Sequence, residues 1–419
     1  IILKNKPDYQ QQMKVHVKSY GCSANIAEGE IIEGQLETAE EKNADATIFN
    51  ICTVKGDAKI LREIRKYRKQ NPDKKIIITG CISPSIIEPL KKIKAQLIST
   101  HHIDKIKEHI KQKEDKLTKA KPVKLLLPRK RKNKTIAIIP ICTGCLDACS
   151  YCSTRLIKGT LHSYPEEAII KEAENSKGCK EIWLTGQDTG CYGFDTGTNL
   201  VELLKKIVKI LGDFKVRIGM GNPRHTTKYL KELIQTMKHP KIFKFIHIPV
   251  QSGNNKVLKA MRRGHTVETF KEIVQKIRKE IPDMTISTDI IVGHPTETKE
   301  QFEDTLKLVQ EIKPDIINIA RYAPRPGTTA YEMTGQVHGN IRKQRSRQLT
   351  ALQRKISLEK NKKWIGWKGE AIVDEKVKDG VSARNYAYKP IVIRKKIPIG
   401  KKTNVEITEA HTTYLVGRC

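Results

Sequence analysis

The sequence has few aromatic residues and no long apolar run. Phe, Trp and Tyr make up 5% of its 419 residues, so few side chains can stack on a flat ligand. No segment reaches the roughly 18 consecutive apolar residues of a membrane-spanning helix, and residues 1–12 are polar, unlike a signal peptide. We expect a soluble protein without a membrane partner, in which Met13 is the native start and follows a leader or tag remnant.

Cysteine is also sparse. Ten cysteines in 419 residues are too few for a disulfide-stabilised scaffold. Several of them are closely spaced, which is typical of metal ligands. The pattern indicates a reducing compartment, and we expect the cytoplasm.

Acidic residues are outnumbered by basic ones. Lys and Arg number 79 against 46 Asp and Glu, which gives a formal net charge of +33. A charge of this size favours a polyanionic partner, most simply a nucleic acid that is bound through its phosphates. The alternative is a lysine-rich surface that reflects genome composition or thermal adaptation.

The first of three regions, residues 13–120, alternates strands and helices. Short apolar runs at Val15–Lys18, Thr47–Ile51 and Lys75–Thr79 end at turn residues, and Ala58–Lys69 repeats apolar residues with helical spacing. This alternation predicts an open parallel sheet.

A basic segment, Lys113–Lys134, separates the first region from the second. Charge runs usually form solvated linkers, and this is the first interpretation. A loop that contacts phosphates is the alternative.

The second region, residues 135–358, contains six strand–helix units. One helix is expected at Thr266–Glu280 from its apolar face, and another is expected to begin with a capping box of Ser163 and Glu166. Six such units predict a partial (β/α)6 barrel, whose functional residues lie at the C-terminal ends of the strands. The predicted strands are Ile136–Ile139, Glu181–Thr185, Lys215–Gly219, Phe243–Ile248, Thr285–Val292 and Ile316–Ala320.

The last region, residues 360–419, overlaps the end of a basic helical connector at Arg342–Lys363. Its short apolar runs are separated by turn residues, which predicts a small antiparallel β-barrel. Fourteen Lys and Arg against six Asp and Glu favour RNA binding. The expected fold class is therefore α/β, with an open parallel-sheet domain, a partial barrel and a small β-barrel. The apolar runs are Ala371–Val373, Ile391–Ile393, Val405–Ile407 and Tyr414–Val416.

Three cysteines have the spacing of an iron–sulfur site. Cys145, Cys149 and Cys152 form C-x3-C-x2-C after the first strand of the second region. Three thiolates leave one iron of a 4Fe–4S cluster open, and an open iron can bind S-adenosylmethionine, which electron transfer then cleaves. With Cys142, a zinc site of two C-x2-C pairs is the alternative. The pairs are closer together than in zinc ribbons, so we expect Cys142 to be a packed thiol.

Cys22, Cys52 and Cys81 form a second candidate set. Each of them follows one strand of the first region. The C-terminal ends of parallel strands meet at one edge of a sheet, so three thiolates can converge there and hold a second cluster. The alternative is three buried structural cysteines.

Several motifs together resemble those of the radical-SAM methylthiotransferases. They are the two cysteine sets and the segments Pro249–Gly253, Met261–Thr266, Asp289–Thr298 and Tyr322–Thr328. The resemblance covers nearly the whole chain after Met13, and its C-terminal part is similar to a TRAM domain. Trp183–Gly193 and Arg217–His225 are most similar to the enzymes that act on threonylcarbamoyladenosine in tRNA.

The resemblance implies an enzyme that adds a methylthio group to carbon 2 of N6-threonylcarbamoyladenosine beside the anticodon. It implies two 4Fe–4S clusters and two uses of S-adenosylmethionine, one to methylate a sulfur at the second cluster and one to make the radical that takes hydrogen from the base. Cys145, Cys149 and Cys152 are then the catalytic cysteines, and both cysteine sets ligate metal. The expected partners are the anticodon stem–loop of tRNA and an external electron donor, and the protein is expected to be a monomer.

Contacts to S-adenosylmethionine are expected at the C-terminal ends of four barrel strands. Each candidate has an alternative role as a polar group that stabilises the end of a strand. The candidates are Gly186, Gln187, Asp188, Gln251, Ser252, Asp289 and Arg321.

Two other interpretations of the function are open. The methylthio group can go instead to an isopentenyl-modified adenosine in tRNA or to an aspartate of a ribosomal protein, although the net positive charge favours RNA. A protein that binds RNA around an iron–sulfur or zinc site, without turnover, is the non-enzymatic alternative.

Overall fold

The computed structural model describes residues 13–52 and 56–419, and the chain divides into two compact units between Lys130 and Arg131. The expectations about residues 1–12 concern a part of the chain outside the described residues. Within the described ranges, no helix is both long enough and apolar enough to cross a membrane.

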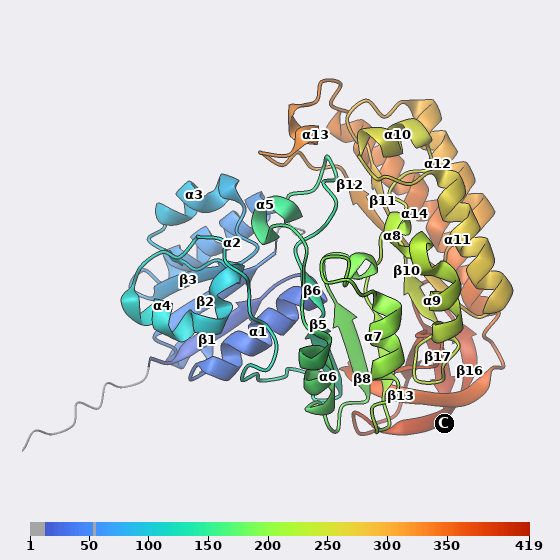
Figure 1. Cartoon of the computed structure of the whole chain (residues 1–419), viewed down its shortest axis with the longest axis horizontal. Coiled ribbons are helices and arrows are strands. Elements are labelled where there is room, and N and C mark those ends of the chain that lie inside the picture. The colour runs from blue at the N-terminus through green and yellow to red at the C-terminus, as the bar shows by residue number, and fades with distance from the viewer. Residues whose placement is uncertain (1–12, 53–55) are drawn as a thin grey trace, which may run out of the picture. The chain divides into compact units, whose positions relative to one another are not determined.

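The first unit is built on a four-stranded parallel sheet in the order β1–β2–β3–β4 (Figure 1). The predicted open parallel sheet is confirmed, and the three expected strands differ from the observed ones by one residue at an end. No apolar run predicts β4, which has only two residues. The strands are Val15–Ser19, Ala46–Ile51, Lys75–Gly80 and Gln96–Leu97.

Helices cover both faces of this sheet. Alternate side chains of β2 and β3 point to opposite faces, as in any strand. On one face they pack with α2 (Asp57–Gln70) and α3 (Ile87–Lys91), and on the other with α1 (Ser23–Gln35) and α4 (Ile106–Gln112). Since α2 contains the predicted helix Ala58–Lys69, that expectation is confirmed. The sheet has an apolar core on each face, which leaves its ends for polar groups.

The basic segment that ends the first unit is not a solvated linker. Lys124 forms an ion pair of 2.6 Å with Glu28 of α1, and both side chains are almost completely buried. Gly34 of α1 lets the segment approach, because a Cβ there would lie 2.4 Å from the backbone of Arg129. The linker prediction is therefore wrong for this part of the segment. A run of charges does not reveal which lysine has a buried partner.

The second unit contains six parallel strands in two three-stranded sheets, β5–β8–β9 and β10–β11–β12. Between the two sheets, an isolated parallel bridge pairs Val216 of β9 with Ile242, which lies just before β10. The order and direction of the strands confirm the predicted partial barrel, with ends that differ by at most two residues. The strands are Ile136–Pro140, Glu181–Thr185, Lys215–Ile218, Phe245–His247, Thr285–Val292 and Ile316–Arg321.

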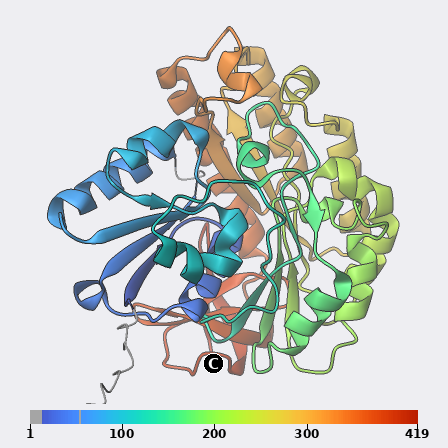
Figure 2. The same ribbon diagram turned by 60° about the vertical axis from the view of Figure 1, so that its left-hand side comes forward.

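Helices connect these strands and lie on their outer side, as Figures 1 and 2 show. The predicted helix Thr266–Glu280 is confirmed as α11, and Thr266 is its N-cap, since its Oγ1 accepts the N–H of Thr269 at 3.2 Å. The longer of these helices are α6 (Glu166–Glu174), α7 (Leu200–Ile207), α9 (Leu230–Met237), α11 (Val267–Glu280) and α12 (Lys299–Ile312).

The expected capping box of Ser163 and Glu166 is wrong. α6 begins at Glu166 after Pro165, and Ser163 Oγ accepts the N–H of Gly193 at 2.9 Å. Glu166 accepts the hydroxyl of Thr198 at 2.7 Å. Both side chains therefore hold the long loop after β8 instead of the first turn of their own helix.

The C-terminal strands form a closed barrel in the order β13–β14–β15–β17–β16, after α14 (Gly339–Lys362), which corresponds to the predicted connector. Neighbouring strands are antiparallel except β15 and β17, which are parallel. The small barrel is confirmed, but the parallel pair and β14 were not expected, since β14 has no continuous apolar run. The strands are Lys368–Val377, Gly380–Arg384, Pro390–Ile393, Lys402–Ala410 and Leu415–Arg418.

The loop between β14 and β15 packs on the N-terminal ends of the barrel strands. Tyr388 lies against Phe243 and Phe245, with ring centroids 4.9 and 5.0 Å apart. Lys389 forms a buried ion pair of 2.8 Å with Asp315, just before β12. This packing covers the N-terminal ends of these strands, and the functional groups are expected at the opposite ends.

Candidate functional site

The C-x3-C-x2-C cysteines lie in a loop that follows β5 and the short strand β6 (Cys142–Thr143) and ends at α5 (Thr154–Lys158). Two backbone hydrogen bonds shape this loop, from Cys152 N–H to Cys149 O at 3.1 Å and from Cys145 N–H to Gly159 O at 3.3 Å. All ten cysteines of the chain lie within the described residues, and none of them is paired in a disulfide there. The loop thus presents three unbridged sulfur atoms.

Burial raises the pKa of Cys145 and of Cys149, and the negative charge of Asp188 adds to the shift at Cys145. Arg263 opposes the shift at Cys149, because its Nη1 donates to Cys149 Sγ at 3.3 Å. A thiol that coordinates a metal is deprotonated by it. Three free, partly buried thiols with one guanidinium donor therefore fit a cluster held by three thiolates.

Gly186, Gln187 and Asp188 form a turn at the C-terminal end of β8. A Cβ on Gly186 would lie 2.5 Å from Sγ of Cys142, which is buried, as expected for a packed thiol. The Oε1 atom of Gln187 is buried and has no hydrogen-bond partner within the described residues. A buried polar atom without a partner is costly unless a ligand satisfies it. Gln187 therefore fits a contact with a cofactor.

Gln251 and Ser252 follow β10. Gln251 has a positive φ of 74°, and its buried Oε1 also lacks a partner in the described part of the chain. Strained backbone of this kind is concentrated at functional sites. Ser252 is fully buried, and its Oγ accepts the N–H of Asn254 at 3.3 Å. Gln251 is thus available for a ligand, whereas Ser252 is used within its own turn.

Asp289 and Arg321 lie on neighbouring strands. Asp289 of β11 accepts hydrogen bonds of 2.8 Å from both His247 of β10 and Asn318 of β12. Arg321 is the last residue of β12 and is exposed. Asp289 therefore links three strands in this structure, and Arg321 can be reached by a ligand.

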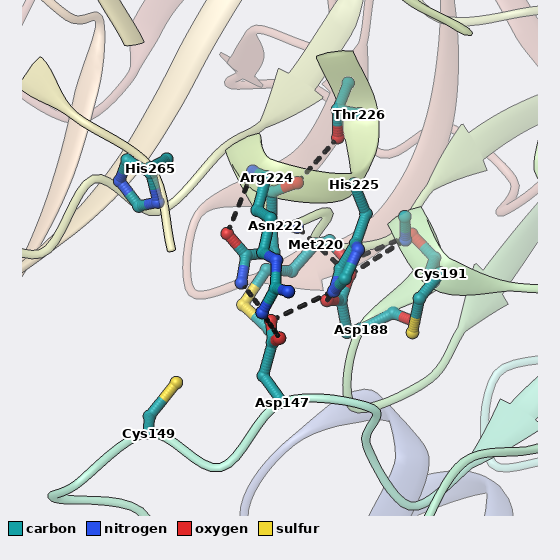
Figure 3. A network of polar contacts seen from close by, with 12 residues as sticks. Asp147, Cys149, Asp188, Cys191, Met220, Asn222, Arg224, His225, Thr226 and His265 are labelled. Atoms are coloured by element: carbon teal, nitrogen blue, oxygen red, sulfur yellow. Dashed lines mark hydrogen bonds and ion pairs between the residues drawn. The ribbon is translucent and has the colours of Figure 1, made fainter. Parts of the chain in front are cut away.

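A buried carboxylate between the first two cluster-loop cysteines was missed by the sequence analysis. Asp147 is 6% exposed and accepts three side-chain hydrogen bonds from the segment after β9 (Figure 3). Burial alone would raise the pKa of Asp147, but the hydrogen bond from His225 and the nearby positive charges lower it overall. The donors are Asn222 Nδ2 at 2.5 Å, Arg224 Nη1 at 2.9 Å and His225 Nε2 at 3.0 Å.

The sequence offered one indication of the hydrogen bonds to Asp147. The motif Arg217–His225 contains all three donors, but the spacing of its residues does not show what they contact. Arg263, the donor to Cys149, likewise lies in a motif of the family resemblance, Met261–Thr266, whose spacing does not show what this side chain contacts.

Asp188, Cys191 and His225 are close enough to hold a metal ion, since their donor atoms lie within 4.8 Å of one another. All three are engaged without one. Asp188 Oδ1 accepts the N–H groups of Gly190 and Asn222, and Cys191 Sγ donates to Asp188 O at 3.3 Å. A structural zinc site also needs four protein ligands. We therefore interpret this group as part of the hydrogen-bonded network.

The first unit brings Cys22, Cys52 and Cys81 together at the C-terminal ends of its strands. The Sγ atoms of Cys22 and Cys81 lie 3.9 and 3.5 Å from Oδ1 of Asn25. Hydrogen bonds to Cys22 and Cys81, and then burial, raise the pKa of Cys52. Gly21, at a φ of +97°, has no room for a Cβ beside Cys52. Three unbridged cysteines thus converge here and fit a second cluster.

Two family models match the chain. The Radical SAM superfamily matches residues 139–309, which include the C-x3-C-x2-C loop. The uncharacterized protein family UPF0004 matches residues 14–99, which include the other cysteine set.

Named relatives match almost the full length. A probable threonylcarbamoyladenosine tRNA methylthiotransferase from Pyrococcus horikoshii is 40% identical over 97% of this chain and 99% of its own. The protein of the same name from Archaeoglobus fulgidus is 38% identical over 97% of this chain and 98% of its own. The human threonylcarbamoyladenosine tRNA methylthiotransferase is 36% identical over 97% of this chain and 74% of its own.

Similarity to solved structures is lower. Methylornithine synthase is 16% identical with a TM-score of 0.39, over 52% of this chain and 62% of its own. Coproporphyrinogen III oxidase from Escherichia coli is 18% identical with a TM-score of 0.42, over 54% of both chains. The full-length relatives show that this chain belongs to the family of the threonylcarbamoyladenosine tRNA methylthiotransferases, which are radical SAM proteins.

Proposed function

We propose that this protein is a tRNA methylthiotransferase that adds a methylthio group to carbon 2 of N6-threonylcarbamoyladenosine next to the anticodon. The observation that carries the proposal is 36–40% identity, over 97% of the chain, to proteins that bear this name. The two sets of unbridged cysteines would supply the ligands that such chemistry requires.

Cys145, Cys149 and Cys152 are the proposed ligands of a 4Fe–4S cluster that binds S-adenosylmethionine at its open iron. When bound, this pair supplies the radical that an inert aromatic C–H bond requires. The buried oxygens of Gln187 and Gln251 are acceptors, and the amino group of S-adenosylmethionine is a donor that would satisfy them. Gly186, Asp188, Ser252, Asp289 and Arg321 complete the proposed surroundings of the cofactor.

Cys22, Cys52 and Cys81 are the proposed ligands of a second 4Fe–4S cluster. Its open iron would bind the sulfur atom that is methylated and then transferred. The contacts of Cys22 and Cys81 with Asn25, and of Cys52 with both of these cysteines, support this assignment.

The TRAM-like barrel and the basic helix α14 are proposed to bind the anticodon stem–loop through its phosphates. The adenine would then leave the stack to react, as in other base-modifying enzymes. We further propose domains at residues 13–120, 135–358 and 360–419, a monomeric protein, an external electron donor and a cytoplasmic reaction, since tRNA is the substrate.

The test is an anaerobic reconstitution followed by turnover with defined tRNAs. We expect about eight irons per chain, as two four-iron clusters require, with cleavage of S-adenosylmethionine on reduction. Mass spectrometry should then find the methylthio group on threonylcarbamoyladenosine. Product formed only on isopentenyladenosine tRNA or on a ribosomal protein would contradict the proposed substrate. Bound zinc without cleavage would contradict the enzyme.

A further inference from the structure

The carboxylate of Asp147 is a junction between two parts of the second unit. It lies in the cluster loop between Cys145 and Cys149, yet the side-chain hydrogen bonds described for it all come from outside that loop. Its three donors come from the segment after β9, including α8 (Pro223–Thr226). An ion pair of 2.9 Å with Arg224 adds a charge to the hydrogen bonds.

Asn222 extends this junction to the turn after β8. Its side chain donates to Asp147, and its backbone N–H donates to Asp188 Oδ1 at 3.0 Å. His225 makes a second connection, with Nε2 at 3.0 Å from Asp147 Oδ2 and 3.8 Å from Asp188 Oδ2. Two residues thus connect the cluster loop with the turn in which S-adenosylmethionine is expected.

Capping of a short helix does not account for this arrangement. The cap of α8 is the bond from Arg224 N–H to Asn222 Oδ1, which leaves the Asn222 amide nitrogen free to donate elsewhere. Asp147, Asp188 and His225 are each at most 6% exposed. Burying two carboxylates is costly unless they are held by hydrogen bonds, and such buried networks make a local geometry unique.

We propose that Asp147 is a positioning residue. Through Asn222 and His225, it holds the cluster loop, residues 145–152, in a fixed position relative to the turn at residues 186–188. The inference deepens the proposed function, because the two loops would carry the cluster and its S-adenosylmethionine. Residues that orient metal ligands from outside typically change affinity or activity by about 10–100-fold when mutated.

The test compares Asp147→Asn with a matched control, Asp374→Asn. Asp374 is another buried carboxylate, with an ion pair of 2.9 Å to Arg384 in the small barrel. Asparagine at position 147 keeps the shape but offers one acceptor where three donors converge. Both variants are made as full-length chains with clusters reconstituted anaerobically. Hydrogen exchange is measured in residues 145–152 and 186–191, together with the Kd of S-adenosylmethionine and the electron paramagnetic resonance spectrum of the reduced cluster.

For Asp147→Asn we expect faster exchange in both loops and about 10-fold weaker binding of S-adenosylmethionine. We also expect a heterogeneous spectrum when S-adenosylmethionine is added. Asp374→Asn should stay within twofold of the wild type in all three measurements. Faster exchange in residues 145–152 alone, with unchanged affinity and spectrum, would overturn the inference, because a merely local role of Asp147 predicts that result.

A second pair keeps the test decisive if Asp147→Asn does not fold. His225→Ala removes the Nε2 donor, whereas His225→Gln can donate an amide N–H to Asp147. The alanine variant should show faster hydrogen exchange in both loops, and the glutamine variant should exchange almost as slowly as the wild type. Equal exchange rates in the two variants would contradict the proposal. If the wild-type protein binds S-adenosylmethionine but never modifies tRNA, this result contradicts the proposed function and does not affect the inference about Asp147.

Discussion

At the scale of single residues, the neighbours of a side chain decide its role more than its type does. Cys142 and Cys145 are three residues apart in one loop. Cys142 is buried against Gly186 and donates to Asp188 O at 3.5 Å, so its thiol is occupied. Cys145 instead belongs to the C-x3-C-x2-C set, and the nearby charge of Cys149 is among the causes that raise its pKa.

Mutation of one cysteine set can distinguish the contributions of the two proposed cluster sites. Changing Cys22, Cys52 and Cys81 together to Ala should lower the iron content from about eight to about four per chain. Cleavage of S-adenosylmethionine should persist, because the C-x3-C-x2-C loop is intact, but no methylthio product should form. The measurement is anaerobic iron counting with product analysis.

Cys179→Ser is the control for this change. Cys179 is a buried thiol outside both sets, and it donates to Lys134 O at 3.3 Å. This variant should retain all of the iron. Full iron content in the triple variant would show that the first unit holds no cluster.

Glu181 makes stability depend on pH. It is fully buried at the start of β8, and burial, followed by the charge of Asp374, raises its pKa to about 7. Trp183, Arg217 and Arg384 oppose the shift. The folded protein therefore keeps this proton at pH values where the unfolded chain has lost it. The stability contributed by the group is complete below pH 4.5 and is lost as the pH rises through about 7.

Glu181→Gln removes this titration. Between pH 5 and pH 8 the wild type should lose about 3 kcal/mol more unfolding free energy than the variant, since each pKa unit is worth about 1.4 kcal/mol. Urea denaturation at the two pH values measures the difference. Parallel pH profiles for the two proteins would contradict the raised pKa.

At the scale of elements, strand prediction succeeded where burial is continuous. Parallel strands that are covered on both faces have unbroken apolar runs, as β2 does with all six residues buried. β4 and β14 were missed because the first has two residues and the second alternates apolar with polar ones. The capping box failed because Ser163 and Glu166 bond to a loop that is distant in sequence.

The segment 124–130 is held on α1 by contacts that include the buried ion pair of Lys124 with Glu28 and a backbone hydrogen bond of 2.8 Å from Lys130 N–H to Glu30 O. Lys124→Met should destabilise the first unit by about 3–5 kcal/mol, because it removes the cation from the buried Glu28 carboxylate. Combining it with Glu28→Leu should recover most of the lost free energy of unfolding, since two apolar side chains leave no buried charge that needs a partner. Chemical denaturation of the single and double variants measures both effects. A single variant as stable as the wild type would contradict a stabilising role for this pair.

At the scale of the whole molecule, the charge of +33 predicts strongly salt-dependent binding of tRNA. For about 6–10 phosphate contacts, affinity should fall by about 10³–10⁵-fold between about 50 and 200 mM salt. Changing the exposed Lys343, Arg347 and Arg354 of α14 to Gln should reduce the slope of log Kd against log salt by about 0.9 for each phosphate that is no longer neutralised.

A matched set on the first unit is the control for this experiment. Arg62, Arg65 and Lys66 are exposed cations on α2, and their change to Gln should alter the slope less than the α14 set does. Binding measured by filter retention at several salt concentrations gives the slopes. Equal slopes for the two variants would place the RNA contacts elsewhere.

The sequence by itself determined the α/β class, the parallel strands, the short strands of the small barrel and the C-x3-C-x2-C set, because each of these is a local pattern of burial or spacing. The set of Cys22, Cys52 and Cys81 followed only indirectly, from the expected order of the strands that precede them. Only the tertiary structure decided that Asp147 meets Asn222, 75 residues further along the chain, and that Lys124 is buried on Glu28, 96 residues away. The physical reason is that a polar side chain has many partners available within reach of the folded chain, and nothing local selects one. Folding selects it, by bringing the donors and acceptors of distant loops into the same desolvated space.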